Sequence, residues 1–418
     1  MKLPAQLILV AVPEPDQQNR FSAAKGSGPE AIYKLQDPER NTVWGFVVVD
    51  NTQRGPGLGG IRLAPDLSQL EVQRLARSMT LKNAAAGLPY GGGKSGLIVD
   101  PSLLADEPQV RANLFDLFAE ALYPLHTYIA APDMGTNEQD IQRIYEFNCK
   151  QSNSTEHQRG GAGRPPANGG IPIDEWGLTA HGLVSAVVSL EHLLPNFKIE
   201  GAKVVIQGYG NVGAPTANKL SRRGSKVIGA SDIHAGLWHP QGLNIDEMER
   251  VRLQARGLSN YSLPVERKFG PGKIDWLLEA PCDILVPAAR PDAITAKNAD
   301  RIQCRIILQG ANAPVNKITQ YYLENRRGIL CLADFIVNVG GVIGCAVESK
   351  LGGDAEFKKK IQATGTRRYV EELIDKIVGG NVTEIYQRLS ETRESDITFT
   401  EQALLFAEEK ICNSESIL

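Results

Sequence analysis

The sequence predicts an α/β protein with two domains, of which the second is a doubly wound parallel sheet. Its 418 residues suit two or three domains at roughly 150 residues per domain. Short apolar segments alternate with helical patterns from residue 175 to residue 340, which is typical of parallel strands joined by helices. One of these segments leads directly into a glycine-rich turn and then into a helix.

The composition is that of a folded globular protein and excludes several classes of function. Hydrophobic residues make up 42% and charged residues 22%, and the formal net charge is −3. A chain with this balance has no basic field that would collect nucleic acid. Its six cysteines contain no C-x-x-C pair. We therefore expect reduced thiols in a cytoplasmic protein, with no disulfide framework and no metal site.

The start of the chain predicts no membrane segment. The apolar run 7–12 is far shorter than a membrane span, and Pro13-Glu14-Pro15 follows it in place of a signal-peptide cleavage site. We therefore expect a β-strand there and no association with a membrane.

Patterns along the first 170 residues predict strands and helices separated by loops. The expected elements are strands over 42–50 and 97–99 and helices over 71–86 and 110–122. The glycine-rich segment 54–60 and the polar segment 151–170 are expected to be loops, the second of them a linker close to a hinge.

The remainder of the chain changes character. Parallel strands are expected over 203–207, 226–232, 283–287, 305–309 and 329–332. From about residue 345 the pattern becomes helical, with helices expected over 354–376 and 401–412.

A glycine-rich turn matches the dinucleotide fingerprint G-x-G-x-x-G. Its residues are Gly208, Tyr209, Gly210, Asn211, Val212 and Gly213. The turn follows the strand 203–207 and opens a helix, which is the context that the fingerprint requires. Asp232 ends the next strand and can accept a hydrogen bond from a ribose 2′-hydroxyl, and no Arg or Lys follows it before Trp238. These features favour a dinucleotide-binding turn over an ordinary turn with incidental glycines. They favour NAD as the cofactor, with NADP possible.

Two lysines stand where a cation needs a partner. Lys82 lies at the edge of the apolar face of its helix, and Lys94 follows a run of three glycines. A desolvated lysine has a lowered pKa that suits acid–base chemistry. The alternatives are a snorkelling surface lysine at position 82 and a solvated loop lysine at position 94.

The segment around Lys94 also resembles a phosphate-binding P-loop, G-x-x-x-x-G-K-[ST], but its spacing fails. The first glycine should stand six residues before Lys94, where the sequence has Leu88. The segment also follows a helix instead of a strand. A nucleoside triphosphatase is therefore the weaker alternative.

Asp133 is a third candidate for chemistry. It lies in a turn between Pro132 and Gly135, after the apolar piece 128–131. Taken alone, it is better interpreted as a cap of the helix that follows.

Together these motifs resemble the Glu/Leu/Phe/Val dehydrogenase superfamily over nearly the whole chain. In family order they are GGIR at 59–62, MTLKNAAAGLPYGGGKSG at 79–96, APDMGTNEQD at 131–140, GYGNVG at 208–213, CDILVPAA at 282–289, QGANAP at 309–314 and ADFIVNVGGV at 333–342. The resemblance implies a homo-oligomer, commonly a hexamer, that uses NAD or NADP to convert an L-amino acid reversibly to a 2-oxo acid and ammonia. A non-catalytic homologue is the remaining alternative.

The resemblance also implies how the domains are divided. It places a substrate-binding and oligomerisation domain at 1–175 and a Rossmann-type dinucleotide-binding domain at 176–344, separated by a cleft that closes for hydride transfer. The helices of 345–418 are expected to pack back on the first domain.

Individual residues acquire roles by the same resemblance. Lys94 is implied to be the catalytic lysine that activates water, and Asp133 the aspartate that moves protons to and from the amino nitrogen. Lys82 is implied to hold the substrate α-carboxylate. The residues implied at the cofactor are Gly208, Gly210, Asn211, Val212, Gly213, Asp232, Thr179, Ala288, Ala289 and Asn312, with Asn338 on the substrate side.

Two positions depart from the glutamate branch of the family. That branch has a lysine before the pair Gly59-Gly60, where this chain has Leu58, and a serine at the position of Cys345. Both changes remove polar partners of a side-chain carboxylate, whose burial against Leu58 would be costly. The sequence therefore favours an apolar substrate, similar to leucine, valine or phenylalanine, with glutamate as the alternative.

Overall fold

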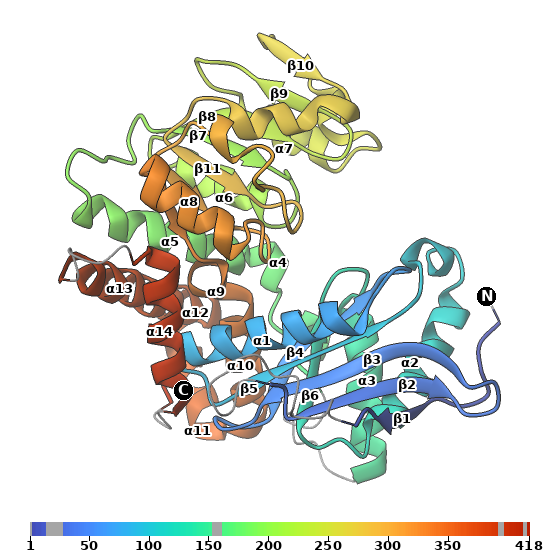
Figure 1. Cartoon of the computed structure of the whole chain (residues 1–418). Helices are drawn as coiled ribbons and strands as arrows, with labels where there is room; N and C mark the ends of the chain where they lie inside the picture. Colours follow the sequence, from blue (N-terminus) through green and yellow to red (C-terminus); the bar gives the residue numbers. More distant parts are fainter. Residues whose placement is uncertain (1, 14–27, 153–160, 392–396, 413–415) are drawn as a thin grey trace. The chain divides into compact units, whose positions relative to one another are not determined.

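The computed structural model describes residues 2–13, 28–152, 161–391, 397–412 and 416–418, which fold into two compact α/β units (Figure 1). The first unit comprises Met1–Pro172, Val342–Thr366 and Ala407–Leu418. The second comprises Ile173–Gly341 and Arg367–Phe406.

The described part of the first unit contains a six-stranded sheet in the order β1-β2-β3-β5-β4-β6. Its strands are β1 (Ile8–Ala11), β2 (Ala31–Asp37), β3 (Thr42–Asn51), β4 (Gly57–Leu63), β5 (Gly91–Leu97) and β6 (Tyr128–Pro132). Strand β4 runs parallel to both β5 and β6, whereas β3 runs antiparallel to β5. The expected strands at 7–12 and 42–50 are confirmed as β1 and β3.

Helices cover both faces of this sheet. They are α1 (Gln69–Ala85), α2 (Pro108–Leu122) and α3 (Glu138–Ser152). Phe115 and Phe118 of α2 and Ile141 of α3 lie in a core with one face of the sheet. Val72 and Ala76 of α1 pack with strand residues on the other face. The expected helices at 71–86 and 110–122 are thus confirmed as α1 and α2.

The loop expected over 54–60 is wrong for 57–60, which begin strand β4. The glycine-rich segment around Lys94 is also a strand. Strand β5 covers the residues around Lys94, upstream of the strand expected at 97–99. A Cβ on Gly59 would lie 1.7 Å from the carbonyl oxygen of Gly93, and one on Gly92 would lie 2.1 Å from Thr80 Oγ1. Close packing on both faces thus requires glycine and overrides its poor strand propensity. Because Lys94 lies within a strand, a P-loop is excluded.

Part of the polar segment 151–170 lies outside the described residues, and the rest is not a free linker. Arg164 is 2% exposed and donates from Nε to Glu348 Oε1 at 3.1 Å. The same oxygen accepts hydrogen bonds from the backbone amides of Gly163 and Arg164. The described residues of this segment are therefore fixed against α10 (Gly340–Gly353) by a buried ion pair.

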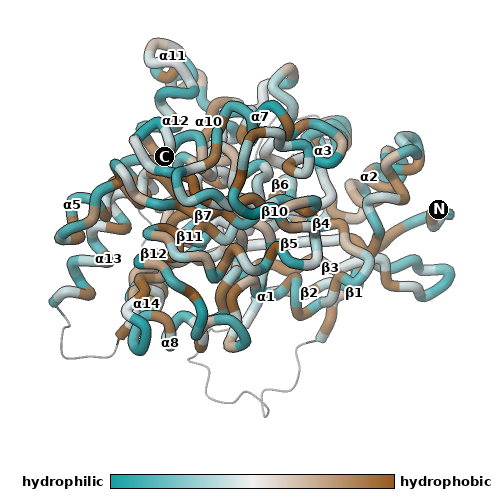
Figure 2. Tube along the Cα trace, turned by 90° about the horizontal axis from the view of Figure 1, so that it is seen from above, coloured by the Kyte–Doolittle hydropathy of each residue, from teal (hydrophilic) through white to brown (hydrophobic). Residues whose placement is uncertain are grey.

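The described part of the second unit contains a seven-stranded sheet in the order β10-β9-β8-β7-β11-β12-β13. The strands are β7 (Lys203–Gln207), β8 (Lys226–Ser231), β9 (Gly236–Trp238), β10 (Arg267–Phe269), β11 (Ile284–Pro287), β12 (Ile306–Leu308) and β13 (Leu330–Leu332). Strands β8, β7, β11, β12 and β13 are parallel, which confirms the doubly wound sheet. Strands β7, β11 and β12 are largely apolar (Figure 2), as expected of strands buried on both faces.

The structure also contains elements that the sequence pattern did not predict. Strands β9 and β10 add to the sheet in antiparallel fashion, and β2 pairs with β1 and β3. Strands β9 and β10 are each three residues long, too short to show a two-residue alternation.

The helices of this part of the chain begin with α4 (Ile173–Trp176), α5 (Leu178–Leu193), α6 (Gly213–Ser221), α7 (Ile245–Arg252), α8 (Lys317–Arg327) and α9 (Asp334–Val337). They are followed by α10, α11 (Ala355–Thr364), α12 (Thr366–Ile374), α13 (Gly380–Glu391) and α14 (Phe399–Cys412). The helix expected over 354–376 is interrupted at Gly365, whose φ of 87° cannot continue a right-handed helix.

The expectation that all helices of 345–418 pack on the first unit is wrong. Helices α10 and α11 belong largely to the first unit, but residues 367–406 belong to the second. The buried side chains of Val382 and Ile385 show why, because α13 packs against α5 and α9.

One helical stretch, Asp334–Gly353, is long and apolar enough to cross a membrane by composition alone. Inside this protein, 72% of its apolar window is buried, which is typical of a core helix.

Candidate active site

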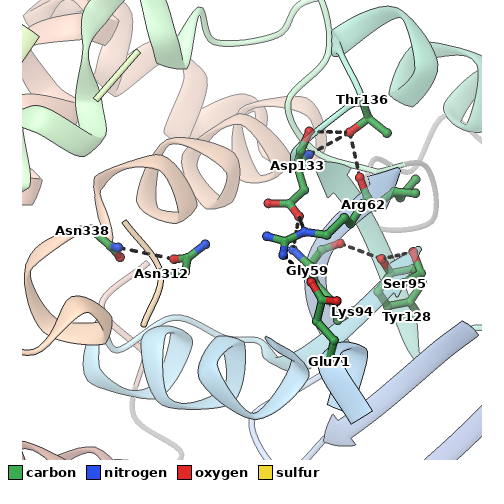
Figure 3. Close-up of polar contacts among 11 residues, drawn as sticks. Gly59, Arg62, Glu71, Lys94, Ser95, Tyr128, Asp133, Thr136, Asn312 and Asn338 are labelled. Carbon is green, nitrogen blue, oxygen red and sulfur yellow. Dashed lines mark hydrogen bonds and ion pairs between the residues drawn. The ribbon is translucent and has the colours of Figure 1, made fainter. Parts of the chain in front are cut away.

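The catalytic candidates of the first unit lie on one face of its sheet (Figure 3). A Cβ on Gly60 would lie 2.6 Å from Asp133 Cβ and 3.2 Å from Lys94 Nζ. Because side chains alternate along a strand, Leu58 and Arg62 share this face of β4 with Gly60. The missing side chain of Gly60 therefore leaves the room in which Lys94 and Asp133 meet.

Asp133 is at the centre of a charged cluster. Its Oδ2 lies 2.9 Å from Lys94 Nζ and 2.9 Å from Arg62 Nε. Arg62 in turn donates from a terminal nitrogen to Glu71 Oε1 at 2.8 Å. The side chain of Lys94 is 4% exposed and that of Arg62 is 7% exposed, so the two cations are shielded from solvent.

Burial and charge shift the proton affinities of this cluster. Burial lowers the pKa of Lys94, Asp133 opposes the shift, and the charge of Arg62 adds to it. Burial alone would raise the pKa of Asp133, but Lys94 and Arg62 outweigh it and hold that pKa well below its usual range. Asp133 is therefore a carboxylate, next to a lysine that loses its proton more easily than usual.

The turn that carries Asp133 is held by its own hydrogen bonds. The backbone amide of Asp133 donates to Thr136 Oγ1 at 2.8 Å, and Thr136 Oγ1 donates to the carbonyl of Ile61 at 2.9 Å. Asn137, not Asp133, accepts from the first amides of α3. The interpretation of Asp133 as a helix cap is therefore wrong.

The opposite face of the sheet supports the site. Tyr128 donates from its hydroxyl to the carbonyl of Gly59 at 2.7 Å, and Ser95 Oγ lies 2.8 Å from the same hydroxyl. These contacts fix β4, β5 and β6 to one another beside Gly60, Lys94 and Asp133.

The predicted substrate residues are buried. Lys82 is 6% exposed in the last turn of α1, so the snorkelling surface lysine is wrong. Leu58 is 1% exposed. Cys345, on α10, is buried with its Sγ 3.8 Å from the position of a Cβ on Gly163.

A cavity of about 660 Å³ lies in the second unit at the carboxyl ends of β7, β8 and β11. Because β7 lies between β8 and β11, the strand order reverses here, which is where open α/β sheets bind ligands. The predicted cofactor residues that line it are Gly208, Gly210, Asp232, Ala288 and Ala289.

The glycines of the fingerprint have the geometry that a pyrophosphate requires. Gly208 has a φ of 94°, and a Cβ there would lie 2.8 Å from Ala289. A Cβ on Gly210 would meet no atom of the described residues within 4 Å, so space is open beside the turn. A Cβ on Gly213 would lie 2.0 Å from the carbonyl of Gly208, which brings the start of α6 against the turn. These residues therefore fit a dinucleotide.

The two other residues predicted in the fingerprint, Asn211 and Val212, are not among those that line the cavity. Val212 is the residue before α6 and adds no side-chain cap. Asn211 donates from Nδ2 to Asp174 Oδ2 at 2.8 Å, so its amide is already bonded to a carboxylate.

The carboxylate of Asp232 is hydrogen-bonded to the backbone around the cavity. It accepts hydrogen bonds from the amides of His234, Ala235 and Leu258 at 2.8, 2.8 and 2.6 Å. A carboxylate has about four acceptor positions, so one remains for a ribose hydroxyl.

The other predicted cofactor residues lie around the end of α9. Asn338 donates from Nδ2 to the carbonyl of Gly310 at 3.3 Å and to Asn312 Oδ1 at 3.4 Å. Its Oδ1 is buried without a hydrogen-bond partner among the described residues, which suits an amide donor of a ligand. Thr179 Oγ1 lies 3.1 Å from the position of a Cβ on Gly341.

Sequence reasoning missed Glu71 and Arg252, and it named Arg62 and Arg290 only as possible partners of a substrate side-chain carboxylate. Glu71 could not be found from short-range spacing, because its contact with Arg62 is tertiary. Arg252 and Arg290 line the cavity beside Asp232 although neither is close to it in the sequence. Arg290 pairs with Asp275 at 3.1 Å and Arg252 with Glu249 at 3.2 Å.

Comparison with known proteins identifies the family of this chain. The family described as Glutamate/Leucine/Phenylalanine/Valine dehydrogenase matches residues 169–415, and the Glu/Leu/Phe/Val dehydrogenase, dimerisation domain, matches residues 29–148. The chain is 34% identical over 354 residues to the NADP-specific glutamate dehydrogenase of Saccharolobus shibatae, with 80% of each chain covered. It is 34% identical over 320 residues to the catabolic NAD-specific glutamate dehydrogenase of Bacillus subtilis, with 74% of this chain and 71% of that chain covered.

The fold is also that of a solved structure. Hetero-hexameric glutamate dehydrogenase from Thermus thermophilus, in its Leu-bound form, aligns with a TM-score of 0.76 and 24% identity. The alignment covers 98% of this chain and 89% of that chain. The chain therefore belongs to the Glu/Leu/Phe/Val dehydrogenase family and is an NAD(P)-dependent amino-acid dehydrogenase.

Proposed function

We propose that this protein catalyses the reversible oxidative deamination of L-glutamate to 2-oxoglutarate and ammonia. The observation that carries the proposal is that both curated relatives described above, which match 80% and 74% of this chain, are glutamate dehydrogenases. They support glutamate better than the apolar substrate that Leu58 and Cys345 suggest.

The charged cluster of the first unit supplies the groups that such a reaction needs. Lys82 holds the substrate α-carboxylate. A bound nicotinamide would supply the acceptor for the hydride of the substrate Cα. Lys94, whose pKa is lowered by burial, takes a proton from the water that attacks the resulting imine. Asp133 moves protons to and from the substrate nitrogen, and the positive charge of the nearby lysines stabilises the developing oxyanion.

An apolar L-amino acid is the second candidate, and Leu58 is the observation that favours it. Leu58 is buried and shares a face of β4 with Gly60, the residue beside Lys94 and Asp133. An aliphatic substrate side chain against Leu58 gains about 0.8 kcal/mol for each methylene that it buries. A carboxylate at the same place would lose its hydration.

Steady-state kinetics with L-glutamate and L-leucine decide between the two substrates. We expect a higher kcat/KM for glutamate. Cys345→Ser should raise the glutamate value about tenfold, because a hydrogen bond to a charged group contributes about 1.5–3 kcal/mol. Cys345→Ala is the matched control and should not raise it. If leucine has the higher kcat/KM in the unaltered enzyme, the glutamate proposal is wrong and the apolar candidate stands.

We further propose that NAD is used in preference to NADP. A 2′-phosphate beside Asp232 would meet a carboxylate, and the nearby Arg290 and Arg252 already have acidic partners. Asp275→Asn should free Arg290 and raise kcat/KM for NADP relative to NAD. Glu372→Gln is the control, because it removes an equal charge from an exposed ion pair on α12. A higher kcat/KM for NADP in the unaltered enzyme would contradict the preference.

Assembly and location are also proposed on the basis of these relatives. The match of residues 29–148 to a dimerisation domain supports a homo-oligomer, for which we propose a cytoplasmic hexamer. Light scattering of the purified protein measures the size of the assembly, and a monomer would contradict it.

A further inference from the structure

Arg62 has no part in the chemical steps described above, yet it contacts the group that moves the protons. Its Nε donates to Asp133 Oδ2 at 2.9 Å, and a terminal nitrogen donates to Glu71 Oε1 at 2.8 Å. Arg62 is nearly buried, whereas the side chain of Glu71 is 38% exposed. A cation in this position thus joins the proton-transfer site to an acid at the start of α1 (Figure 3).

The geometry of these contacts fixes the rotation of the Asp133 carboxylate. Lys94 and Arg62 both bind Oδ2. The other oxygen, Oδ1, accepts no hydrogen bond from the residues that the structure describes. A guanidinium donates along fixed directions, whereas an ammonium rotates freely. Arg62 therefore determines which carboxylate oxygen remains available for the substrate.

Arg62 and Glu71 also act on Lys94 through their charges. The charged groups on the elements packed around Lys94 are Asp50 on β3, Arg62 on β4, Glu71, Arg74, Arg77 and Lys82 on α1, and Asp133 after β6. Of these, Arg62 lowers the pKa of Lys94, whereas Asp133 and Glu71 raise it. Loss of Arg62 and loss of Glu71 should therefore shift the titration of Lys94 in opposite directions.

We propose that Arg62, held in place by Glu71, is a positioning residue that aims Asp133 at the substrate nitrogen and sets the charge state of the Lys94–Asp133 pair. The proposal rests on the proposed catalytic roles of Lys94 and Asp133. Arg62 acts through these two residues and not on the substrate.

The test compares the pH profiles of kcat/KM for deamination in Arg62→Met, Arg62→Lys and Glu71→Gln. Arg62→Met should lower kcat about 10²-fold through loss of alignment, and should move the acid limb to higher pH. Glu71→Gln should move the acid limb to lower pH with a smaller loss of kcat. Arg62→Lys restores the charge, so its acid limb should stay close to that of the unaltered enzyme while kcat remains low.

The matched control is an arginine whose ion pair lies outside the charged cluster. Arg143→Met removes an arginine that pairs with Asp116 at 2.6 Å on the outer helices, and should change neither kcat nor the acid limb. An unaltered kcat in Arg62→Met, or acid limbs that stay fixed or move in the same direction, would overturn the proposal. If Arg62→Met does not fold, Glu71→Gln still tests the proposal, because Glu71 is half-exposed and its replacement should move the acid limb to lower pH. Failure of the proposed function is a separate outcome, since the unaltered enzyme would then have a higher kcat/KM for leucine than for glutamate, and the pH profiles of the variants would be measured with leucine.

Discussion

Replacement of Lys94 by alanine is expected to lower kcat by about 10²–10⁴-fold while the melting temperature changes little. The activity is lost because Lys94 is the base that takes a proton from water beside Asp133. The fold should persist because Asp133 keeps its ion pair with Arg62 at 2.9 Å when the lysine is removed. The measurements are single-turnover kinetics and thermal unfolding.

The control for this variant is Lys34→Ala, which removes a partly exposed lysine from β2 of the same sheet. It should leave kcat unchanged. Binding of NADH, measured by fluorescence, should persist in Lys94→Ala because the cavity with the fingerprint glycines is formed by residues of the second unit. Near-normal turnover in Lys94→Ala would end the mechanism proposed here.

Replacement of Asp133 by asparagine is expected to lower both activity and stability. The proton path to the substrate nitrogen is lost, which should lower kcat by about 10²–10⁴-fold. The change also leaves Lys94 and Arg62 buried without the carboxylate between them, and removal of one partner from a buried pair costs about 3–5 kcal/mol. Urea unfolding and steady-state kinetics measure the two effects.

The loss of stability in Asp133→Asn should depend on pH with a defined sign. Lys94 already loses its proton at a lower pH in the folded state than in the unfolded state, and removal of Asp133, which raises its pKa, lowers that folded-state pKa further. The unfolded state then binds more protons between the two pKa values, so stability rises with pH through that window. The deficit should therefore be largest near neutral pH and shrink in alkaline solution. Asp116→Asn, which breaks a half-exposed pair with Arg143, should lose little stability at any pH. A deficit that does not change with pH would show that Lys94 is not the group responsible.

The sequence predicted the second unit better than the first, for a physical reason. Parallel strands buried on both faces are continuous apolar runs, and the helix after Gly213 follows a turn that only a few residue types can form. Strands β4 and β5 have the opposite composition. They are rich in glycine because side chains would meet the backbone of the neighbouring strand at Gly59, Thr80 at Gly92 and Tyr128 at Gly93, so their composition resembles a loop.

The candidate site shows the same limit. Lys94 and Asp133 could be selected from their motifs, but their contact with Arg62 depends on the pairing of β4 with β5 and β6. The neighbours of Asp232 were missed for a similar reason. A search of the residues that follow Asp232 could not find Arg290, which the fold brings to the cavity from the end of β11. Short-range spacing in the sequence identifies candidate site residues, whereas their charged partners come from distant segments that only the fold brings together.

The most direct test of the central claim is the stoichiometry of the reaction with L-glutamate and NAD. Reduced cofactor, ammonia and 2-oxoglutarate should form in equal amounts, and Lys94→Ala should form all three at a rate lower by about 10²–10⁴-fold. Reduction of NAD without release of ammonia, or product formation that does not depend on Lys94, would contradict oxidative deamination at the Lys94–Asp133 pair.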